Sequence, residues 1–303
     1  MTHWSFGERN MAELIAGLVD VFAETPFSGN PLAVVEGGEA LADGGMQRIS
    51  REFNQAETTF LLPSVRADWR LRSFTASGAE VFGAGHNALG AWLWLAETGK
   101  LGALDAPCRF QQEIGEDVLP IVIERVHGRI YGRMRQAPLR LLPALEEIAP
   151  LAQALGLEVH DILTTPAPRP GYTGVAHLLV RLRDAATVDR AAPKHERLYA
   201  VLQAAGAEGC YVYAHDPQAP QNAYARFFNP TVGLWEDAAT GTAAGPLAAY
   251  LRTESLLRDD KLAIEQGAKM GRRSILNIRL TPDPELSGSG LVVLQGVLAT
   301  PVR

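Results

Sequence analysis

The sequence predicts a mixed α/β protein built from two similar halves. Its 303 residues allow one large or two medium domains, because single cores seldom grow past about 250–300 residues. Strand patterns and helix patterns alternate along the chain. Residues 70–93 can also be laid without gaps on residues 226–249, each copy reading as strand, glycine-rich turn and apolar helix, which indicates a duplicated unit; chance similarity is the alternative. The identical pairs are Arg70 and Arg226, Thr75 and Thr231, Glu80 and Glu236, Gly85 and Gly241, and Ala88 and Ala244.

The first half opens with two apolar runs around a turn-rich stretch, which predicts a β-hairpin. Met46, Ile49 and Phe53 recur at helical spacing and predict the helix that follows. A second helix is apolar nearly all round, which indicates burial, and Gly99 is placed to end it. The expected strands cover residues 14–22, 32–36, 59–63 and 69–75, and the expected helices cover 44–55 and 85–101.

The second half repeats this alternation beyond a proline- and arginine-rich loop within residues 125–143. We expect domains over 11–128 and 129–290, with a C-terminal strand at 291–303 packing back on the first, and a loose extension at 1–10. The expected helices cover residues 144–157 and 194–206, and the expected strands lie within 174–182, 209–216, 263–280 and 290–302.

Composition excludes several classes of function. The net charge of −6 and the absence of a dense Lys/Arg block argue against a nucleic-acid partner. No apolar run approaches the roughly 20 residues of a membrane span, and the N-terminus lacks the order of a signal peptide. Cys108 and Cys210 form no CxxC pair, so free thiols in the cytoplasm are expected.

A glycine-rich stretch at 83–90, "GAGHNALG", matches the G-x-G-x-x-A pattern of dinucleotide-binding folds, and Asp105 follows about 20 residues later. That fold requires a continuous apolar strand just before the glycines. The preceding residues, "SFTASGAE", do not supply one, so a nucleotide-dependent oxidoreductase is the less favoured alternative.

The helix starts themselves offer a better explanation of the glycines. Gly85 and His86 open one apolar helix, and Gly241 and Thr242 open its repeat. Unpaired backbone N–H groups at two helix N-termini can bind one anion, which predicts a carboxylate substrate between them. The alternative is that both glycines only permit tight turns.

Three ionisable residues are candidates for the chemistry, two of them at these turns and the third, Glu57, at an expected helix-to-strand junction. The helix start lowers the pKa of His86 and favours a neutral imidazole that can relay a proton, although a lone histidine is more often structural. Asp237 directly precedes the second turn, where capping a helix is the simpler role. Glu57 has neighbours poor in charge, so partial burial would raise its pKa toward neutrality, as a general acid/base requires; a solvated carboxylate is the alternative.

Five segments together resemble the PhzF family, phenazine-biosynthesis-like isomerases that share a fold with diaminopimelate epimerase. They are "VDVFAETPFSGNPLAVV" (19–35), "ISREFNQAETTFLLP" (49–63), "GAGHNALGAW" (83–92), "WEDAATGTAAGPLAAYL" (235–251) and "EQGAKMGRRS" (265–274). The resemblance implies two pseudo-symmetric α/β domains, each a curved mixed sheet around a central helix, with the active site in the cleft between them. It also implies a homodimer that needs no metal or organic cofactor.

The resemblance further assigns roles to individual residues. The implied catalytic residues are Glu57, His86 and Asp237, and the implied substrate-binding residues are Asn30, Gly85, Gly241 and Thr242. Glu57 would move a proton on a small carboxylate, and Asn30 would order the first loop near it. Related epimerases place a cysteine at each glycine turn, whereas this chain has His86 and Thr242 there, which excludes a dithiol racemase.

The sequence departs from the family pattern at the second turn, where Ala238 replaces a proline and Thr242 replaces a serine. The threonine methyl group narrows the pocket, so the substrate can differ from the dihydro-hydroxyanthranilate of the phenazine enzyme. The leading expectation is a cofactor-independent isomerase. The alternative from another class is a catalytically idle relative that binds a small carboxylate or a protein partner in the same cleft.

Overall fold

The mixed α/β fold is confirmed in the computed structural model, which describes residues 11–232 and 234–301; the extension expected at 1–10 lies outside them. The first half contains β1 (Met11–Val21), β2 (Asn30–Glu36), α1 (Asp43–Phe53), β3 (Glu57–Leu62), β4 (Trp69–Thr75), β5 (Glu80–Val81), α2 (His86–Glu97), β6 (Cys108–Ile114), β7 (Asp117–Val126) and β8 (Arg129–Arg135). The second half contains β9 (Arg140–Leu141), α3 (Ala149–Leu155), β10 (Arg169–Tyr172), β11 (Ala176–Arg181), α4 (Ala185–Arg190), α5 (His195–Ala205), β12 (Gly209–His215), β13 (Ala223–Asn229), β14 (Leu234–Asp237), α6 (Gly241–Thr253), β15 (Lys261–Gln266), β16 (Ser274–Leu280) and β17 (Pro284–Pro301).

The two halves pair their strands in the same order. In the first half β1–β2 is antiparallel, β2–β3 parallel, β3–β4 antiparallel, β4–β6 parallel, and β6–β7–β8 antiparallel. In the second half β10–β11 is antiparallel, β11–β12 parallel, β12–β13 antiparallel, β13–β15 parallel, and β15–β16–β17 antiparallel. Each strand of one series therefore has a counterpart in the other.

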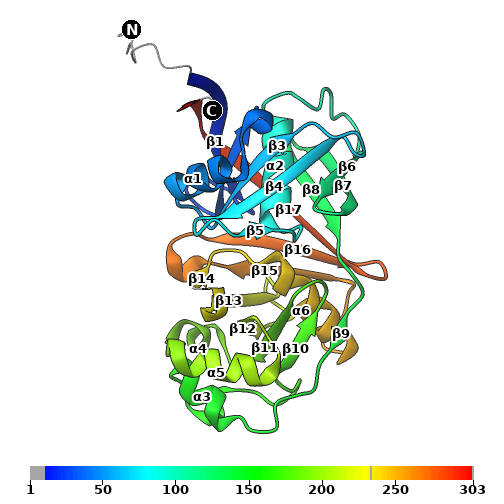
Figure 1. The fold of residues 1–303 in the computed structure, drawn as a ribbon. Coiled ribbons are helices and arrows are strands. Elements are labelled where there is room, and N and C mark those ends of the chain that lie inside the picture. The colour runs from blue at the N-terminus through cyan, green and yellow to red at the C-terminus, as the bar shows by residue number, and fades with distance from the viewer. Residues whose placement is uncertain (1–10, 233, 302–303) are drawn as a thin grey trace.

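The long strand β17 joins the halves. Its first part pairs with β16 and with β8, and its last part pairs antiparallel with β1, from Gly290 opposite Val21 to Pro301 opposite Met11. This last pairing closes a ring of strands, β1–β2–β3–β4–β6–β7–β8–β17, in the first half. In Figure 1 β17 runs from the boundary between the halves to the far end of the upper one.

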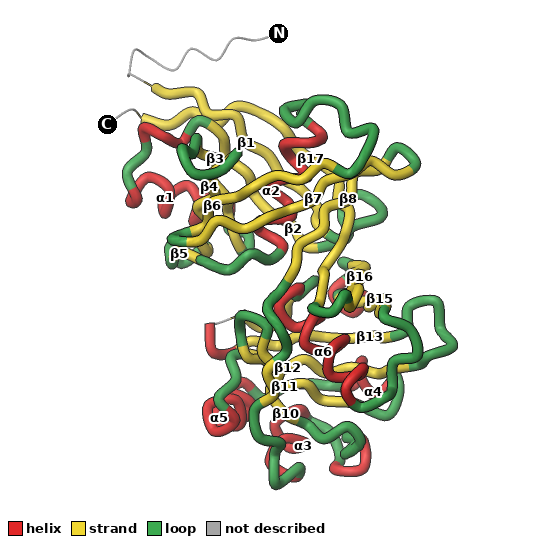
Figure 2. The backbone as a smooth tube through the Cα atoms, turned by 90° about the vertical axis from the view of Figure 1, so that its right-hand side faces the viewer, coloured by secondary structure: helices red, strands yellow, loops and turns green. Residues whose placement is uncertain are grey.

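Helix α2 contacts seven strands of that ring, and all its residues from His86 to Ala96 are buried. The indole N–H groups of two tryptophans on this helix are hydrogen-bonded inside the core. Trp92 Nε1 donates to Gln112 Oε1 at 3.0 Å, and Trp94 Nε1 donates to Glu36 Oε1. Helix α6 contacts β10, β11, β15, β16 and β17 in the second half. Both helices belong to one apolar cluster, so a continuous core spans the halves. Figure 2 shows α2 and α6 one above the other, with α3 and α5 at the lower end.

Helix α3 is shorter than predicted, and Pro150 gives the reason. The sequence predicts a helix over residues 144–157, but the structure has one only over Ala149–Leu155. Proline has no backbone N–H and fits the first turn of a helix but not its interior. The helix therefore begins next to Pro150, and the residues before it form a loop.

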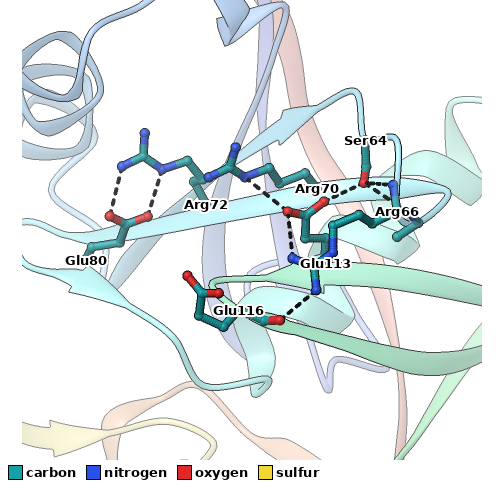
Figure 3. Close-up of polar contacts among 8 residues, drawn as sticks. Ser64, Arg66, Arg70, Arg72, Glu80, Glu113 and Glu116 are labelled. Carbon is teal, nitrogen blue, oxygen red and sulfur yellow. Dashed lines mark hydrogen bonds and ion pairs between the residues drawn. The ribbon is translucent and has the colours of Figure 1, made fainter.

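The ungapped alignment of the halves pairs the wrong arginine in the first half. In the second half, Arg226 forms a two-bond fork with Glu236, and its guanidinium lies over the ring of Phe228. In the first half Arg72 forms the same two-bond fork, with Glu80 (Figure 3). The Arg72 guanidinium also lies over the ring of Phe74.

Arg70, the residue that the alignment selects, instead faces Glu113, with its Nε atom 3.9 Å from Glu113 Oε1. An irregularity in the pairing of β13 with β14 and the short 3-10 helix at Pro230–Val232 add two residues between the arginine and the glutamate of the second half. The alignment is therefore correct at the glutamates and wrong by two residues at the arginines.

Among the helices that the structure describes, none combines the length and the hydropathy that a membrane crossing requires.

Candidate active site

Two ionisable side chains of the first half approach each other where β3 and α2 begin. Glu57 follows the end of α1, where Asn54 takes a left-handed φ of 52° and terminates the helix. His86 Nδ1 lies 3.8 Å from Glu57 Oε2. Among the described residues, Glu57 Oε2 and His86 Nε2 are enclosed by protein and have no hydrogen-bond partner. Buried polar atoms are nearly always paired, so these two atoms are free to contact a bound molecule.

Asp237, at the end of β14, is held by side chains from both halves. Asn30 Nδ2, at the start of β2, donates to Asp237 Oδ1 at 2.8 Å and to the Ala239 carbonyl at 3.0 Å. Thr240 Oγ1 donates to Asp237 Oδ2 at 2.6 Å. The cap residue of α6 is Thr240 rather than Asp237. Asn30 therefore joins the two halves at the site, and its bonds go to the second turn.

Burial and neighbouring charge set the protonation of the site. Burial, with a smaller contribution from the charge of Asp237, raises the pKa of Glu57 to about 8. Burial raises the pKa of Asp237 to about 6, opposed by the hydrogen bonds from Thr240 and Asn30. Burial lowers the pKa of His86 to about 4. At pH 7 the site thus holds a neutral imidazole, a mostly ionised Asp237 and a Glu57 that exchanges its proton near neutrality.

Asn87 orders the glycine turn before α2. Its Oδ1 accepts from the Gly85 N–H at 2.8 Å, while its Nδ2 donates to the Gly83 carbonyl at 2.9 Å and to Ser73 Oγ at 3.1 Å. The Gly85 amide is therefore already bonded within the protein. The amides that follow it in the first turn of α2 have no intrahelical acceptor and are the ones that can face an anion.

The second glycine turn packs against β17 and is bonded to two glutamine side chains, one just after β8 and one at the end of β15. A Cβ atom at Gly241 would lie 2.5 Å from Leu286 Cδ2 of β17, which explains the glycine by space alone. The Gly241 carbonyl accepts from Gln136 Nε2 at 2.8 Å. Gln266 Nε2 also holds the turn in place by donating to the Asp237 carbonyl at 2.8 Å.

Thr242, the second residue of α6, has a partner that the sequence did not suggest. Its Oγ1 lies 2.9 Å from Nε2 of His177, a buried histidine on β11. The structure therefore brings predicted residues together in two pairs, Glu57 near His86 and Asn30 bonded to Asp237, and His86 and Asp237 each lie at one of the glycine turns. The supporting residues missed from sequence are Asn87, Thr240, Gln266 and His177.

The described residues contain no group of three or more His, Cys, Asp or Glu side chains arranged to hold a metal ion. Cys108 and Cys210 are free thiols on β6 and β12, away from both glycine turns. Two surface hollows of about 600 and 770 Å³ lie elsewhere, one beside β15 and β16 and the other beside α1.

Comparison with known proteins adds the family. The family model described as PhzC-PhzF, phenazine biosynthesis-like protein, matches residues 19–297. The chain belongs to this family. The resemblance predicted from the five sequence segments is therefore confirmed, and the family shares the mixed α/β fold seen here.

Curated and solved relatives cover almost the whole chain. The trans-2,3-dihydro-3-hydroxyanthranilate isomerase of Pseudomonas aeruginosa is 32% identical, over 92% of this chain and 97% of its own. The structure of a Bacillus anthracis phenazine biosynthesis protein of the PhzF family superposes with a TM-score of 0.86 at 26% identity, over 95% and 99% of the chains. A predicted epimerase from Pseudomonas aeruginosa superposes with a TM-score of 0.79 at 30% identity, over 94% and 98%. The isomerase name of the first relative agrees with the enzyme class that the sequence predicts.

Proposed function

We propose that this protein is a cofactor-independent isomerase in which Glu57 shifts a proton along the carbon skeleton of a small carboxylate. One observation carries the proposal: Glu57 Oε2 and His86 Nε2 are two buried, unpartnered atoms of neighbouring side chains. A purely structural pair would be expected to bond to each other or to the protein. Here Nδ1 and Oε2 remain 3.8 Å apart, beyond a hydrogen bond, and leave acceptor and donor capacity for a substrate.

In the proposed reaction, the ionised Glu57 carboxylate takes a proton from an activated C–H group. The electron pair of that bond moves across the adjacent double bond, and Glu57, whose proton exchanges with solvent in the meantime, returns a proton to the carbon at its far end. Atoms and charge balance, so no further reactant is required. With a pKa of about 8, about a tenth of the Glu57 carboxyl groups are ionised at pH 7 and the remainder can donate, a balance that suits a group acting in both directions.

The other predicted residues hold the substrate. The neutral His86 can donate or accept one hydrogen bond through the unpartnered Nε2. The free amides of the first turns of α2 and α6 and the hydroxyl of Thr242 would bind the carboxylate. Asp237, fixed by Asn30 and Thr240, would orient a polar group of the substrate, and its charge adds to burial in raising the pKa of Glu57.

We further infer that the matching strand series are two domains related by duplication, each folded around its buried helix, with the substrate between them. The matched pairing orders and the shared Arg–Glu forks support this inference. Since residues 129–133 of β8 pair with β7, we draw the boundary after the end of β8 at Arg135 rather than at residue 128. By this division β17 belongs to both domains.

The direct test is Glu57→Gln, which keeps the shape of the side chain and removes the proton carrier. With trans-2,3-dihydro-3-hydroxyanthranilate, the compound in the name of the Pseudomonas aeruginosa relative, the wild type should incorporate deuterium from D₂O into the product. The variant should lose about two to four powers of ten in rate. Glu52→Gln, the same change on the exposed face of α1, is the matched control and should leave the rate unaltered.

A Glu57→Gln variant with near-normal turnover would contradict the acid/base role. If the wild type binds the compound but returns it unchanged and without deuterium, the chain is a binding relative rather than an isomerase of this substrate.

A further inference from the structure

His177 is a buried histidine whose place in the fold is tied to the second glycine turn. It lies on β11, is 3% exposed, and packs edge to face against Phe227 with ring centroids 4.9 Å apart. Its Nε2 is 2.9 Å from Thr242 Oγ1, in the first turn of α6. The residue therefore links a core strand to the helix start that we propose binds the substrate carboxylate.

The other ring nitrogen has no partner among the described residues. His177 Nδ1 is buried and unbonded. Burial also lowers the pKa of His177 to about 3, so the imidazole is neutral at any working pH and has a single N–H. Either Nδ1 carries that hydrogen and leaves it unbonded inside the protein, or Nε2 carries it and donates it to Thr242. Orphaned buried N–H groups are rarer than under-satisfied acceptors, which favours the second tautomer.

We propose that His177 is a positioning residue: as the Nε2–H tautomer it donates to Thr242 Oγ1 and thereby turns the Thr242 hydroxyl hydrogen toward the substrate. This inference rests on the proposed function, because it concerns how the second turn meets a carboxylate. Because Oγ1 accepts the hydrogen bond from His177, the O–H group of Thr242 is left to donate to the substrate, as the backbone amides beside it would. This end of the site then selects for an acceptor oxygen and against a donor group.

The same tautomer excludes a different chemistry at this place. A threonine hydroxyl 2.9 Å from an imidazole nitrogen has the spacing of a nucleophile and its base. A base must accept the hydroxyl proton at Nε2, but in the proposed tautomer Nε2 already carries a hydrogen. His177 therefore fixes the polarity of Thr242 rather than activating it for covalent attack.

The first test reads the tautomer in the resting protein. Long-range ¹H–¹⁵N correlation spectra of protein labelled with ¹⁵N-histidine distinguish the two neutral forms, and His177→Gln assigns the signal. We expect the Nε2–H pattern, unchanged between pH 5 and pH 8. An Nδ1–H pattern, for example with that hydrogen directed at the Phe227 ring, or a protonated ring, would overturn the proposal.

The second test measures binding of 3-hydroxyanthranilate, an aromatic carboxylate that cannot undergo the proposed proton shift. Thr242→Val should weaken binding roughly ten- to a hundredfold, as expected for a lost hydrogen bond to a charged group. His177→Leu should weaken it about three- to tenfold by freeing the hydroxyl to rotate, and His177→Gln, which keeps an N–H donor, should restore most of the affinity. In the Thr242→Val background, His177→Leu should have no further effect.

Binding that is unaffected by His177→Leu, or that is as weak in His177→Gln as in His177→Leu, would overturn the positioning role. A separate arm keeps this result apart from the proposed isomerase activity. Turnover of Glu57→Gln is measured separately from these affinities, and Glu52→Gln, on the exposed face of α1, should bind 3-hydroxyanthranilate with an affinity within about threefold of wild type. If Glu57 proves dispensable for turnover while the tautomer and the affinities are as expected, the proposed mechanism fails and the role of His177 stands.

Discussion

Glu57 couples the protonation of the site to the stability of the whole protein. In the unfolded chain a glutamate ionises near its ordinary pKa of 4.5, whereas in the folded protein Glu57 holds its proton up to about pH 8. Between these values the folded state binds more protons than the unfolded state, so the free energy of unfolding falls as pH rises. The stabilisation is complete below about pH 4.5 and is lost by about pH 8 and above.

Glu57→Gln should remove this pH dependence. Relative to wild type, the variant should gain stability between pH 5 and pH 9, by up to about 4 kcal/mol. Urea denaturation of both proteins at pH 5, 7 and 9 measures the difference, with Glu52→Gln as the exposed control that should follow wild type. Parallel curves for Glu57→Gln and wild type would mean that Glu57 ionises normally in the folded protein.

Single residues differ in how far the sequence can predict them. His86 and Asp237 are detectable as candidates because each stands at a glycine turn, and Glu57 is detectable because its segment, residues 49–63, resembles the family. His177 is not, because its partner Thr242 lies 65 positions away and a lone histidine on an apolar strand usually indicates core packing. The bond from the Gly85 amide to Asn87 also escapes prediction, since it depends on a turn geometry that the letters "GHN" do not determine.

At the scale of elements, the loop after β15 contains two glycines with different surroundings, and only the first of them lies against the segment that leads into the second turn. Gly267 and Gly271 both have left-handed φ angles, 76° and 72°. A Cβ atom at Gly267 would lie 2.6 Å from the Ala238 carbonyl oxygen and 2.4 Å from the Arg272 carbonyl oxygen, while one at Gly271 would meet nothing within 4 Å. Alanine substitutions at the two positions can therefore be compared: both introduce backbone strain, but only the one at Gly267 also displaces the segment next to Asp237.

Gly271→Ala should cost about 1–2 kcal/mol of stability, from its φ angle alone, and leave turnover unchanged. Gly267→Ala should cost at least about 3 kcal/mol, because the methyl group also forces two backbone segments apart, and should lower turnover. Urea denaturation and activity on the same substrate check both. If the two variants lose equal stability and equal turnover, the segment at Ala238 can move without affecting either, and the prediction is wrong.

The pairing of elements was predictable in outline but not in register. Strand and helix periodicity locate most elements, and the glycine turns reveal the repeat. The position of Arg72 as counterpart of Arg226 could not be derived, because an irregular strand pairing shifts the arginine by two residues without changing the glutamate. Local sequence contains no information on such a shift, since it is set by the neighbouring strand.

At the scale of the whole molecule, β17 and the shared core should make the halves unfold together. The strand pairs with β8 and β1 of the first half and with β16 of the second half, and α2 and α6 contribute to one apolar cluster. Hydrogen exchange should therefore give peptides of α2 and α6 the same free energy of opening, equal to the global value from urea denaturation. Exchange of α6 at clearly lower free energy would mean that the second half opens independently.

The ring of strands in the first half has a consequence for how the chain is made. Because β1 takes its second neighbour, besides β2, from residues 290–301, one edge of β1 stays open on the ribosome until these residues have been translated. During that interval the backbone groups of β1 are exposed to other nascent chains. Protection by a chaperone, or rapid completion of synthesis, would then govern the yield of native protein more than the speed of any local folding step.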